Sequence, residues 1–167
     1  MLTKVILTVI GHDRPGLTGA LADAVLAAGG NWLESQLARL GGHYVGCVLV
    51  ELPTNSLDTL RAATRTTGLT IDIVPAGDAA PAGTLLSLSV VGQDKPGIVR
   101  EVTAVLAAIG VNIERLETGL QDGSWSGARL FTADADLLLP PGTSEADVRT
   151  ALEAISAEIM VDISVGE

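Results

Sequence analysis

The stretch that decides the fold is Leu7-Thr-Val-Ile-Gly-His-Asp-Arg-Pro-Gly16, because the chain repeats it as Leu88-Ser-Val-Val-Gly-Gln-Asp-Lys-Pro-Gly97. Residue numbers 7 and 88 set the two copies 81 residues apart. At this spacing further residues align without a gap: Ala27 with Ala108, Gly29 with Gly110, Asn31 with Asn112, Gly42 with Gly123 and Gly46 with Gly127. A repeat of this length indicates a duplicated domain rather than a short solenoid unit. We predict a first domain over residues 1–75, a linker over 76–83 and a second domain over 84–167.

The composition describes an acidic chain with enough apolar residues for two small cores. Hydrophobic residues make up 47% of the 167 positions and charged residues 18%, which excludes a disordered chain. Aromatic residues are only 2%, so the interior must be built from Val, Leu, Ile and Ala. The formal charge of −10 repels phosphate backbones and argues against direct binding of nucleic acid.

The start of the chain and its cysteine content indicate where the protein works. The first residues run directly into a strand pattern and lack the features of a signal peptide. No apolar run approaches the roughly 20 residues that a membrane span needs. The single Cys47 cannot form an internal disulfide, which fits a reducing compartment. We therefore expect a cytoplasmic protein that does not bind membranes.

Both copies predict the same order of elements. In the first, residues 3–10 form an apolar strand, residues 11–16 break it, and a helical spacing follows from Leu17 until Gly29 and Gly30 end it. Strands over 32–40 and 44–51, joined by a Gly-Gly turn, a helix from 57 to Gly68 and a strand over 69–74 complete the copy. In the second copy we expect strands over 85–91, 112–120, 124–133 and 159–165, with helices over 98–109 and after Ser144. This order predicts an α+β fold with two ferredoxin-like βαββαβ domains, each an antiparallel sheet with its helices on one face.

The loop between the first strand and the first helix of each copy has a chemistry that suits an α-amino acid. A helix N-terminus offers unpaired N–H groups and partial positive charge to a carboxylate. Asp13 and Asp94 can accept hydrogen bonds from an ammonium group, and Gly11 and Gly92 allow close approach. The structural alternative is that each aspartate only caps its helix and each glycine only serves the turn. Asn31 and Asn112 carry the same pair of interpretations, ligand contact or turn chemistry.

The pattern Gly-x-Asp-Arg/Lys-Pro-Gly, followed by an apolar helix and Gly-x-Asn, resembles the ACT domain, a module that binds amino acids. Two such domains in a chain of this length are similar to the glycine cleavage system transcriptional repressor family. The resemblance covers nearly the whole chain. It implies the βαββαβ fold, pairing of ACT domains side by side, and ligands held at an interface between paired domains.

The resemblance also implies the ligand-binding positions, which are the loop after the first strand and the start of the second. In the first copy these are Gly11, His12, Asp13, Pro15, Gly16, Leu17 and Asn31. In the second copy they are Gly92, Gln93, Asp94, Pro96, Gly97, Ile98 and Asn112. Some amino-acid-binding members carry Asn at the position of Asp13, so the ligand's identity stays open, as does the choice of one binding copy or two. Trp32 stands where isoleucine is usual, and we expect it to pack in the core; the alternative is that it fills space near the interface between paired domains.

Other site chemistries find little support in the sequence. No Gly-Lys-Ser/Thr follows either loop, His12 and His43 lack metal-ligand spacing, and no serine lies in a Gly-x-Ser-x-Gly elbow. Asp134 and Asp136 alternate on a strand and face the same way, which favours a solvated strand end over an active site. We expect no enzyme activity, no cofactor and no metal.

The sequence therefore predicts a regulatory protein. We expect it to bind a small amino acid, with glycine as one candidate, at an ACT domain interface, and to form a homodimer. It would modulate a protein partner, for example a DNA-binding regulator, since the chain has no helix-turn-helix module of its own. The alternative is a ligand-independent interaction or oligomerisation subunit. Whether ACT pairing occurs within one chain or between chains stays open.

Overall fold

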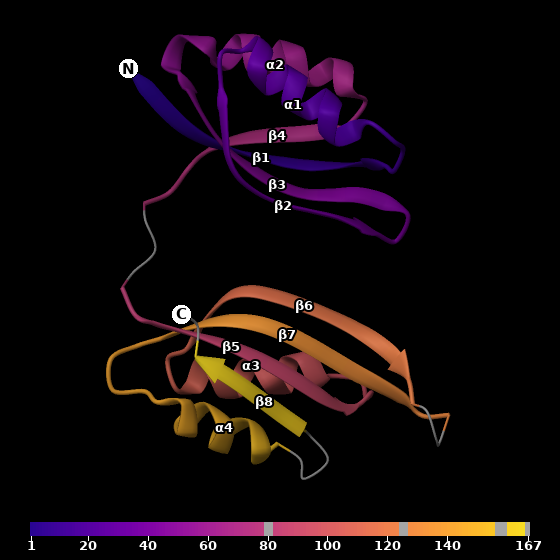
Figure 1. Ribbon diagram of the computed structural model, residues 1–167, viewed down its shortest axis with the longest axis vertical. Helices are drawn as coiled ribbons and strands as arrows, with labels where there is room; N and C mark the ends of the chain where they lie inside the picture. Colours follow the sequence, from indigo (N-terminus) through magenta and orange to yellow (C-terminus); the bar gives the residue numbers. More distant parts are fainter. Residues whose placement is uncertain (79–81, 124–126, 156–159, 166–167) are drawn as a thin grey trace. The chain divides into compact units, whose positions relative to one another are not determined.

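The computed structural model describes residues 1–78, 82–123, 127–155 and 160–165. The chain divides into two compact units, Met1–Ala79 and Ala80–Glu167, called unit 1 and unit 2 below (Figure 1). Unit 1 contains β1 (Leu2–His12), α1 (Leu17–Ala27), β2 (Asn31–Leu40), β3 (His43–Pro53), η1 (Thr54–Ser56), α2 (Leu57–Thr64), η2 (Arg65–Thr67) and β4 (Thr70–Pro75). Unit 2 contains β5 (Thr84–Gln93), α3 (Ile98–Ala108), β6 (Asn112–Asp122), β7 (Arg129–Leu139), α4 (Glu145–Glu153) and β8 (Met160–Val165).

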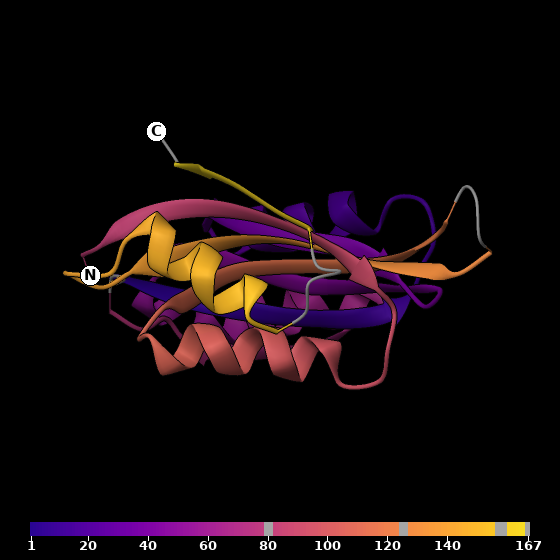
Figure 2. The ribbon, with the colours of Figure 1, turned by 90° about the horizontal axis from the view of Figure 1, so that it is seen from below.

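Each unit is a four-stranded sheet with two helices on one face. The strand orders are β2-β3-β1-β4 and β6-β7-β5-β8, and every neighbouring pair is antiparallel. Figure 1 shows α1 and α2 together on one side of the unit 1 sheet, and Figure 2 shows α3 and α4 together on one side of the unit 2 sheet. The predicted fold class, two ferredoxin-like βαββαβ domains, is confirmed.

The core of each unit follows from alternation along its first strand. In β1 the side chains of Val5, Leu7 and Val9 are buried, and they pack under Leu21 of α1 and Leu60 of α2. This is the pattern expected of a strand with one face toward helices. Unit 2 repeats it with Leu86, Leu88, Val90, Val102, Leu106, Val148 and Leu152.

The second strand of each unit begins with a side chain packed on the core, followed by a shift in register. Trp32 packs against the core of unit 1, as expected from sequence, and Ile113 packs against that of unit 2. The register of β2 on β3 shifts between Trp32 and Glu34, and that of β6 on β7 shifts between Ile113 and Arg115. The same irregularity therefore recurs 81 residues later, although no residue pattern announces it.

The gap-free alignment fails in the hairpins. Two glycines, Gly41 and Gly42, join β2 to β3 with positive φ at both, whereas residues 123–128 join β6 to β7. Pairing on the first strands shows the shift, because Val9 lies opposite Gly46 and Val90 lies opposite Ala133. The expected equivalences of Gly42 with Gly123 and of Gly46 with Gly127 are therefore wrong. The strand predicted over 124–133 instead runs over Arg129–Leu139, and residues 124–126 lie outside the described residues.

Gly46 is required where it stands. Its φ is 147°, and a Cβ there would lie 1.9 Å from the backbone oxygen of Gln36 on β2. No side chain could occupy that position without moving one strand away from the other. The structurally equivalent residue of unit 2, Ala133, carries a Cβ and is buried.

Candidate functional site

The two repeated loops start their helices in the same way, without a side-chain cap. The N-cap residues of α1 and α3 are Gly16 and Gly97, with φ of 89° and 87°, a left-handed conformation that favours glycine. Neither helix receives a side-chain hydrogen bond at its N-cap. The interpretation of Asp13 and Asp94 as helix caps is therefore wrong.

The space over both helix starts is open. A Cβ added at Gly16 or Gly97 would meet no atom within 4 Å. Pro15 and Pro96 are exposed and precede the N-caps, so they belong to the turn rather than to the first helical turn. Leu17 and Ile98, by contrast, are 2% and 4% exposed and anchor the helices in the two cores. Small groups can thus approach the first N–H groups of each helix, which have no intrahelical partner.

In unit 1 the loop is held by polar contacts to three other elements. The carboxylate of Asp13 lies 3.3 Å from Nε of Arg39 on β2, and its backbone N–H donates to Gly42 O at 3.3 Å. The guanidinium of Arg14 donates to the carbonyl of Thr67 at 2.9 Å, which ties the loop to η2. The Asp13 carboxylate therefore already has a partner.

Two further side-chain pairs flank this loop, and sequence reasoning did not identify them. His12 at the end of β1 lies opposite His43, with ring centroids 4.8 Å apart and planes tilted by 31°. The hydroxyl groups of Thr18 and Tyr44 are 2.8 Å apart, joining the first turn of α1 to β3. Both pairs depend on the register of β3 on β1, which the sequence of the Gly-Gly turn does not specify.

In unit 2 the same loop has fewer polar contacts. The backbone N–H of Asp94 donates to Arg129 O at 3.0 Å, but its exposed carboxylate has no hydrogen bond or ion pair among the described residues. Lys95 of the loop pairs with Glu101 in the first turn of α3 at 2.8 Å. Gln93 ends β5 opposite Leu130, so the histidine pair of unit 1 has no equivalent here.

The hydroxyl pair of unit 1 is likewise replaced by apolar residues in unit 2. The repeat spacing aligns Thr18 with Val99, and the β5–β7 register places Phe131 where unit 1 has Tyr44. Similarly, Leu120 lies opposite Phe131 just as Arg39 lies opposite Tyr44. Unit 2 therefore has apolar residues at these three positions, and among the described residues nothing pairs with the carboxylate of Asp94.

The glycine that opens the unit 1 loop has a packing role. A Cβ at Gly11 would lie 2.7 Å from Cδ2 of Leu69, which precedes β4. Gly92, its equivalent, is buried. Glycine at position 11 thus allows close approach of Leu69, and this packing explains the glycine without a ligand.

The two predicted asparagines lie at the far end of each sheet from the loops. Asn31 pairs with Glu51, which pairs with Lys4, seven residues before Gly11 on β1. At about 3.3 Å per residue, roughly 23 Å separates these levels of the sheet. Asn112 occupies the same place in unit 2, and its amide donates to Glu114 at 2.5 Å. Within one unit, loop and asparagine cannot contact the same small molecule.

A charged network covers the sheet face of unit 2 that lies away from its helices. Nε of Arg115 lies 2.6 Å from Asp136, and Ser87 donates to the same carboxylate at 3.2 Å, while Ser89 donates to Asp134. The hydrogen bond from Arg115 and, less strongly, that from Ser87 hold the pKa of Asp136 below its ordinary value. Asp134 and Asp136 share one face as predicted, and they form a structural network rather than an active site.

Two further features, a cluster of metal ligands and a membrane-spanning helix, are absent from the described ranges. No group of three or more His, Cys, Asp or Glu side chains there is arranged to hold a metal ion. No helix in those ranges combines the length and apolar character needed to span a bilayer.

Comparison with known proteins agrees with the fold. The model of the ACT domain matches residues 3–73 and 84–166, which is most of both units. The chain is 22% identical over 160 residues to the glycine cleavage system transcriptional repressor of Escherichia coli (strain K12), covering 92% of this chain and 84% of that protein. It is 28% identical to phosphoserine phosphatase SerB2 of Mycobacterium tuberculosis, covering 97% of this chain but 40% of that enzyme.

Solved structures share the two-unit architecture. A crystal structure of an unknown protein from Galdieria sulphuraria superposes with a TM-score of 0.87 at 28% identity, with both chains fully covered. A crystal structure assigned provisionally as a glycine cleavage system transcriptional repressor superposes with a TM-score of 0.71 at 16% identity, with 99% of both chains covered. The second likeness concerns the fold alone.

Proposed function

The chain belongs to the ACT domain family, and from that premise we propose that it is a non-enzymatic regulator that binds a small amino acid at its strand-to-helix loops. The similarity to a transcriptional repressor of the glycine cleavage system favours glycine as the first ligand to test. The match to the phosphatase covers 40% of that enzyme, so we do not extend its activity to this chain.

The observation that carries the proposal is the carboxylate of Asp94, which precedes the uncapped N-terminus of α3 and has no partner among the described residues. A carboxylate can accept hydrogen bonds from the ammonium group of a zwitterion. The N–H of Ile98 already donates to Lys95 O at 3.3 Å, but the next N–H groups of the first turn of α3 can donate to the carboxylate of the zwitterion, and the open space over Gly97 leaves room for it. Unit 1 offers the same groups, but there the ligand must compete with Arg39 for Asp13.

We propose further that each site is completed by a second ACT domain. The distance between loop and asparagine within a unit means that Asn31 or Asn112 can reach a ligand only on another domain's loop. A homodimer would supply such domains, and sedimentation velocity with and without glycine tests whether ligand and association are linked.

The output would be a change in binding to a protein partner, such as a DNA-binding regulator, in a reducing cytoplasm. The net charge of −10 disfavours direct contact with DNA. A ligand changes partner binding only if it binds one arrangement more tightly, and such couplings are commonly about 1–3 kcal/mol.

Titration calorimetry with a panel of amino acids that includes glycine and serine tests the proposal. We expect one or two members to bind, and Asp94→Ala to weaken binding by about tenfold or more, because a charge-assisted hydrogen bond is lost. Asp23→Ala, an exposed change of equal charge on α1, is the control and should leave affinity unchanged. If no member binds while the oligomeric state is intact, the chain is instead a ligand-independent interaction subunit.

A further inference from the structure

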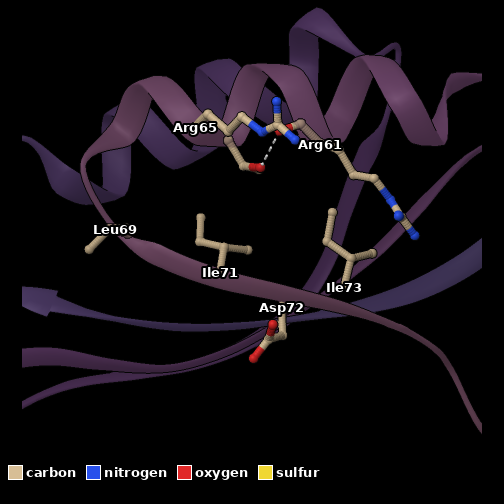
Figure 3. Close-up of a pocket in the computed structure, with 7 residues that line it drawn as sticks. Arg61, Arg65, Leu69, Ile71, Asp72 and Ile73 are labelled. Atoms are coloured by element: carbon tan, nitrogen blue, oxygen red, sulfur yellow. Dashed lines mark hydrogen bonds between the residues drawn. The ribbon is translucent and has the colours of Figure 1, made fainter.

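A groove of about 290 Å³ lies in unit 1 between α2–η2 and β4 (Figure 3). Its floor is apolar and is formed by Leu69, Ile71 and Ile73, while Arg61 and Arg65 stand on the helical side above it. The groove is thus amphipathic, with two cations over an aliphatic floor. Leu69 at one end of its floor packs against Gly11, but neither arginine belongs to the loop in which we place the amino acid.

Arg61 and Arg65 have no side-chain partners within the part of the chain that the structure describes. Neither guanidinium forms an ion pair or hydrogen bond among the described residues, and both side chains are exposed. They are four residues apart, the only two cationic residues of the chain at that spacing, so they lie on one face of the helical stretch. Like charges so placed repel one another and gain from an anion that binds both.

This basic pair is specific to unit 1. Leu60 and Thr64 are the buried residues of α2, and Val148 and Leu152 are those of α4. In α2 these two buried residues are followed by Arg61 and Arg65. In α4 they are followed by Arg149, which pairs with Glu145, and by Glu153. The site therefore arose in, or was kept by, one copy only.

The groove opens beside an unpaired strand edge. Among the described strands, β4 is the outermost of its sheet and pairs with β1 alone. The outer edge of such a strand presents free N–H and C=O groups that can pair with an added strand. Four residues of helix advance about 6.0 Å, and two residues of strand about 6.6 Å, so alternate residues of an added strand match the spacing of the arginines.

We propose that this groove binds an extended acidic segment of a partner protein, which adds to the edge of β4 and places glutamates at positions i and i+2 under Arg61 and Arg65. The aliphatic part of each glutamate would lie beside Ile71 and Ile73, and each carboxylate would meet a guanidinium. The residue between the glutamates faces the other side of the sheet, where Figure 3 shows Asp72, so it is not acidic. The inference rests on the proposed function in that it gives the partner of the regulator a docking site.

The test uses the full-length chain and two labelled peptides of identical composition, measured by fluorescence anisotropy. The first, Thr-Val-Thr-Glu-Thr-Glu-Thr-Val-Thr, has alternate glutamates, and the second, Thr-Val-Thr-Glu-Glu-Thr-Thr-Val-Thr, has adjacent ones. We expect saturable binding of the first and at least about tenfold weaker binding of the second, since only one adjacent glutamate can face the helix. Arg61→Glu and Arg65→Glu should each weaken binding of the first peptide at least about tenfold. Arg100→Glu, an exposed change of equal charge on α3, should not.

Two results would overturn the inference. One is the absence of saturation by the first peptide up to about 1 mM. The other is equal affinity for both peptides, which would reduce the groove to a patch of positive charge. Calorimetry with amino acids on Arg65→Glu keeps the two proposals apart, because that variant should bind the amino acid normally. Register-dependent peptide binding without any amino acid ligand would refute the sensor and uphold the groove.

Discussion

The loops of units 1 and 2 share a backbone and differ in almost every polar contact around it. Both have a left-handed glycine at the N-cap and an aspartate as the first residue after the strand, three residues before that glycine. In unit 1 that aspartate pairs with Arg39 beside a hydroxyl pair, whereas unit 2 has Leu120, Val99 and Phe131 at the corresponding positions and, among the described residues, no partner for Asp94. Duplication has thus preserved the geometry that exposes a helix N-terminus, while the side chains have diverged. The comparison makes unit 2 the better candidate for an amino acid and unit 1 the more constrained loop.

Charge separates the units further. Unit 1 has five Lys or Arg against seven Asp or Glu, a net charge of −2, and unit 2 has five against thirteen, a net charge of −8. The only basic groove described above therefore lies in the nearly neutral unit. An acidic partner segment would meet less repulsion there than on unit 2.

The largest effect is expected at the hairpins. Gly46→Ala should destabilise unit 1 by about 4 kcal/mol, because the methyl group meets the backbone of β2 and the φ of 147° is strained for alanine. Urea unfolding followed by circular dichroism measures this. The reciprocal change at the equivalent position, Ala133→Gly, should cost only about 1 kcal/mol. Equal losses in the two variants would show that the hairpins are not as different as the structure indicates.

The hydroxyl pair offers a smaller effect. Thr18→Val should destabilise unit 1 by about 1–2 kcal/mol, since the Tyr44 hydroxyl, in a residue only 8% exposed, loses its partner. Adding Tyr44→Phe reproduces the Val99 and Phe131 pair of unit 2 and should recover most of that loss. A double-mutant cycle measures the interaction, and simple additivity of the two single changes would contradict a direct contact.

Acidification should weaken unit 2 through two of its carboxyl groups. The hydrogen bond from Arg115 lowers the pKa of Asp136, and the Ser144 side chain, followed by its backbone N–H, lowers that of Asp147 in the capping box of α4. A lowered folded-state pKa gives stability that is fully present above the ordinary carboxyl value near 3.8 and is lost as pH falls below it. Thermal unfolding from pH 6 toward about pH 3 should show this loss, and Arg115→Met should flatten the part due to Asp136. An unchanged slope in that variant would count against the assignment.

The smallest effect on stability is expected at Arg39. Arg39→Leu introduces the residue that unit 2 has at this position, Leu120, and removes the exposed ion pair with Asp13. The free energy of unfolding should therefore change by less than about 0.5 kcal/mol. The same variant frees the Asp13 carboxylate, and calorimetry should then show tighter amino acid binding at unit 1. Weaker binding would mean that Arg39 itself contacts the ligand.

The sequence predicted the fold in more detail than it predicted the contacts of the candidate site. The repeat, the helical spacing after Leu17 and the glycine turns predicted two βαββαβ units, because these patterns depend on local periodicity. The hairpin shift was missed because glycines at 123 and 127 match those at 42 and 46 by residue type alone. The contacts of Asp13, His12 and Thr18 cross between strands and helices, so they depend on a register that no single segment encodes.

The hydrogen bond from Arg14 to Thr67 gives the molecule a way to communicate. It joins the loop proposed for the metabolite to the short helix that starts at Arg65 on the proposed partner surface. If a metabolite at the loop multiplies the partner's affinity by some factor, the partner multiplies the metabolite's affinity by the same factor. The amino acid concentration at which the protein is half-saturated would then depend on the concentration of the partner. Arg14→Ala would uncouple amino acid binding from partner binding.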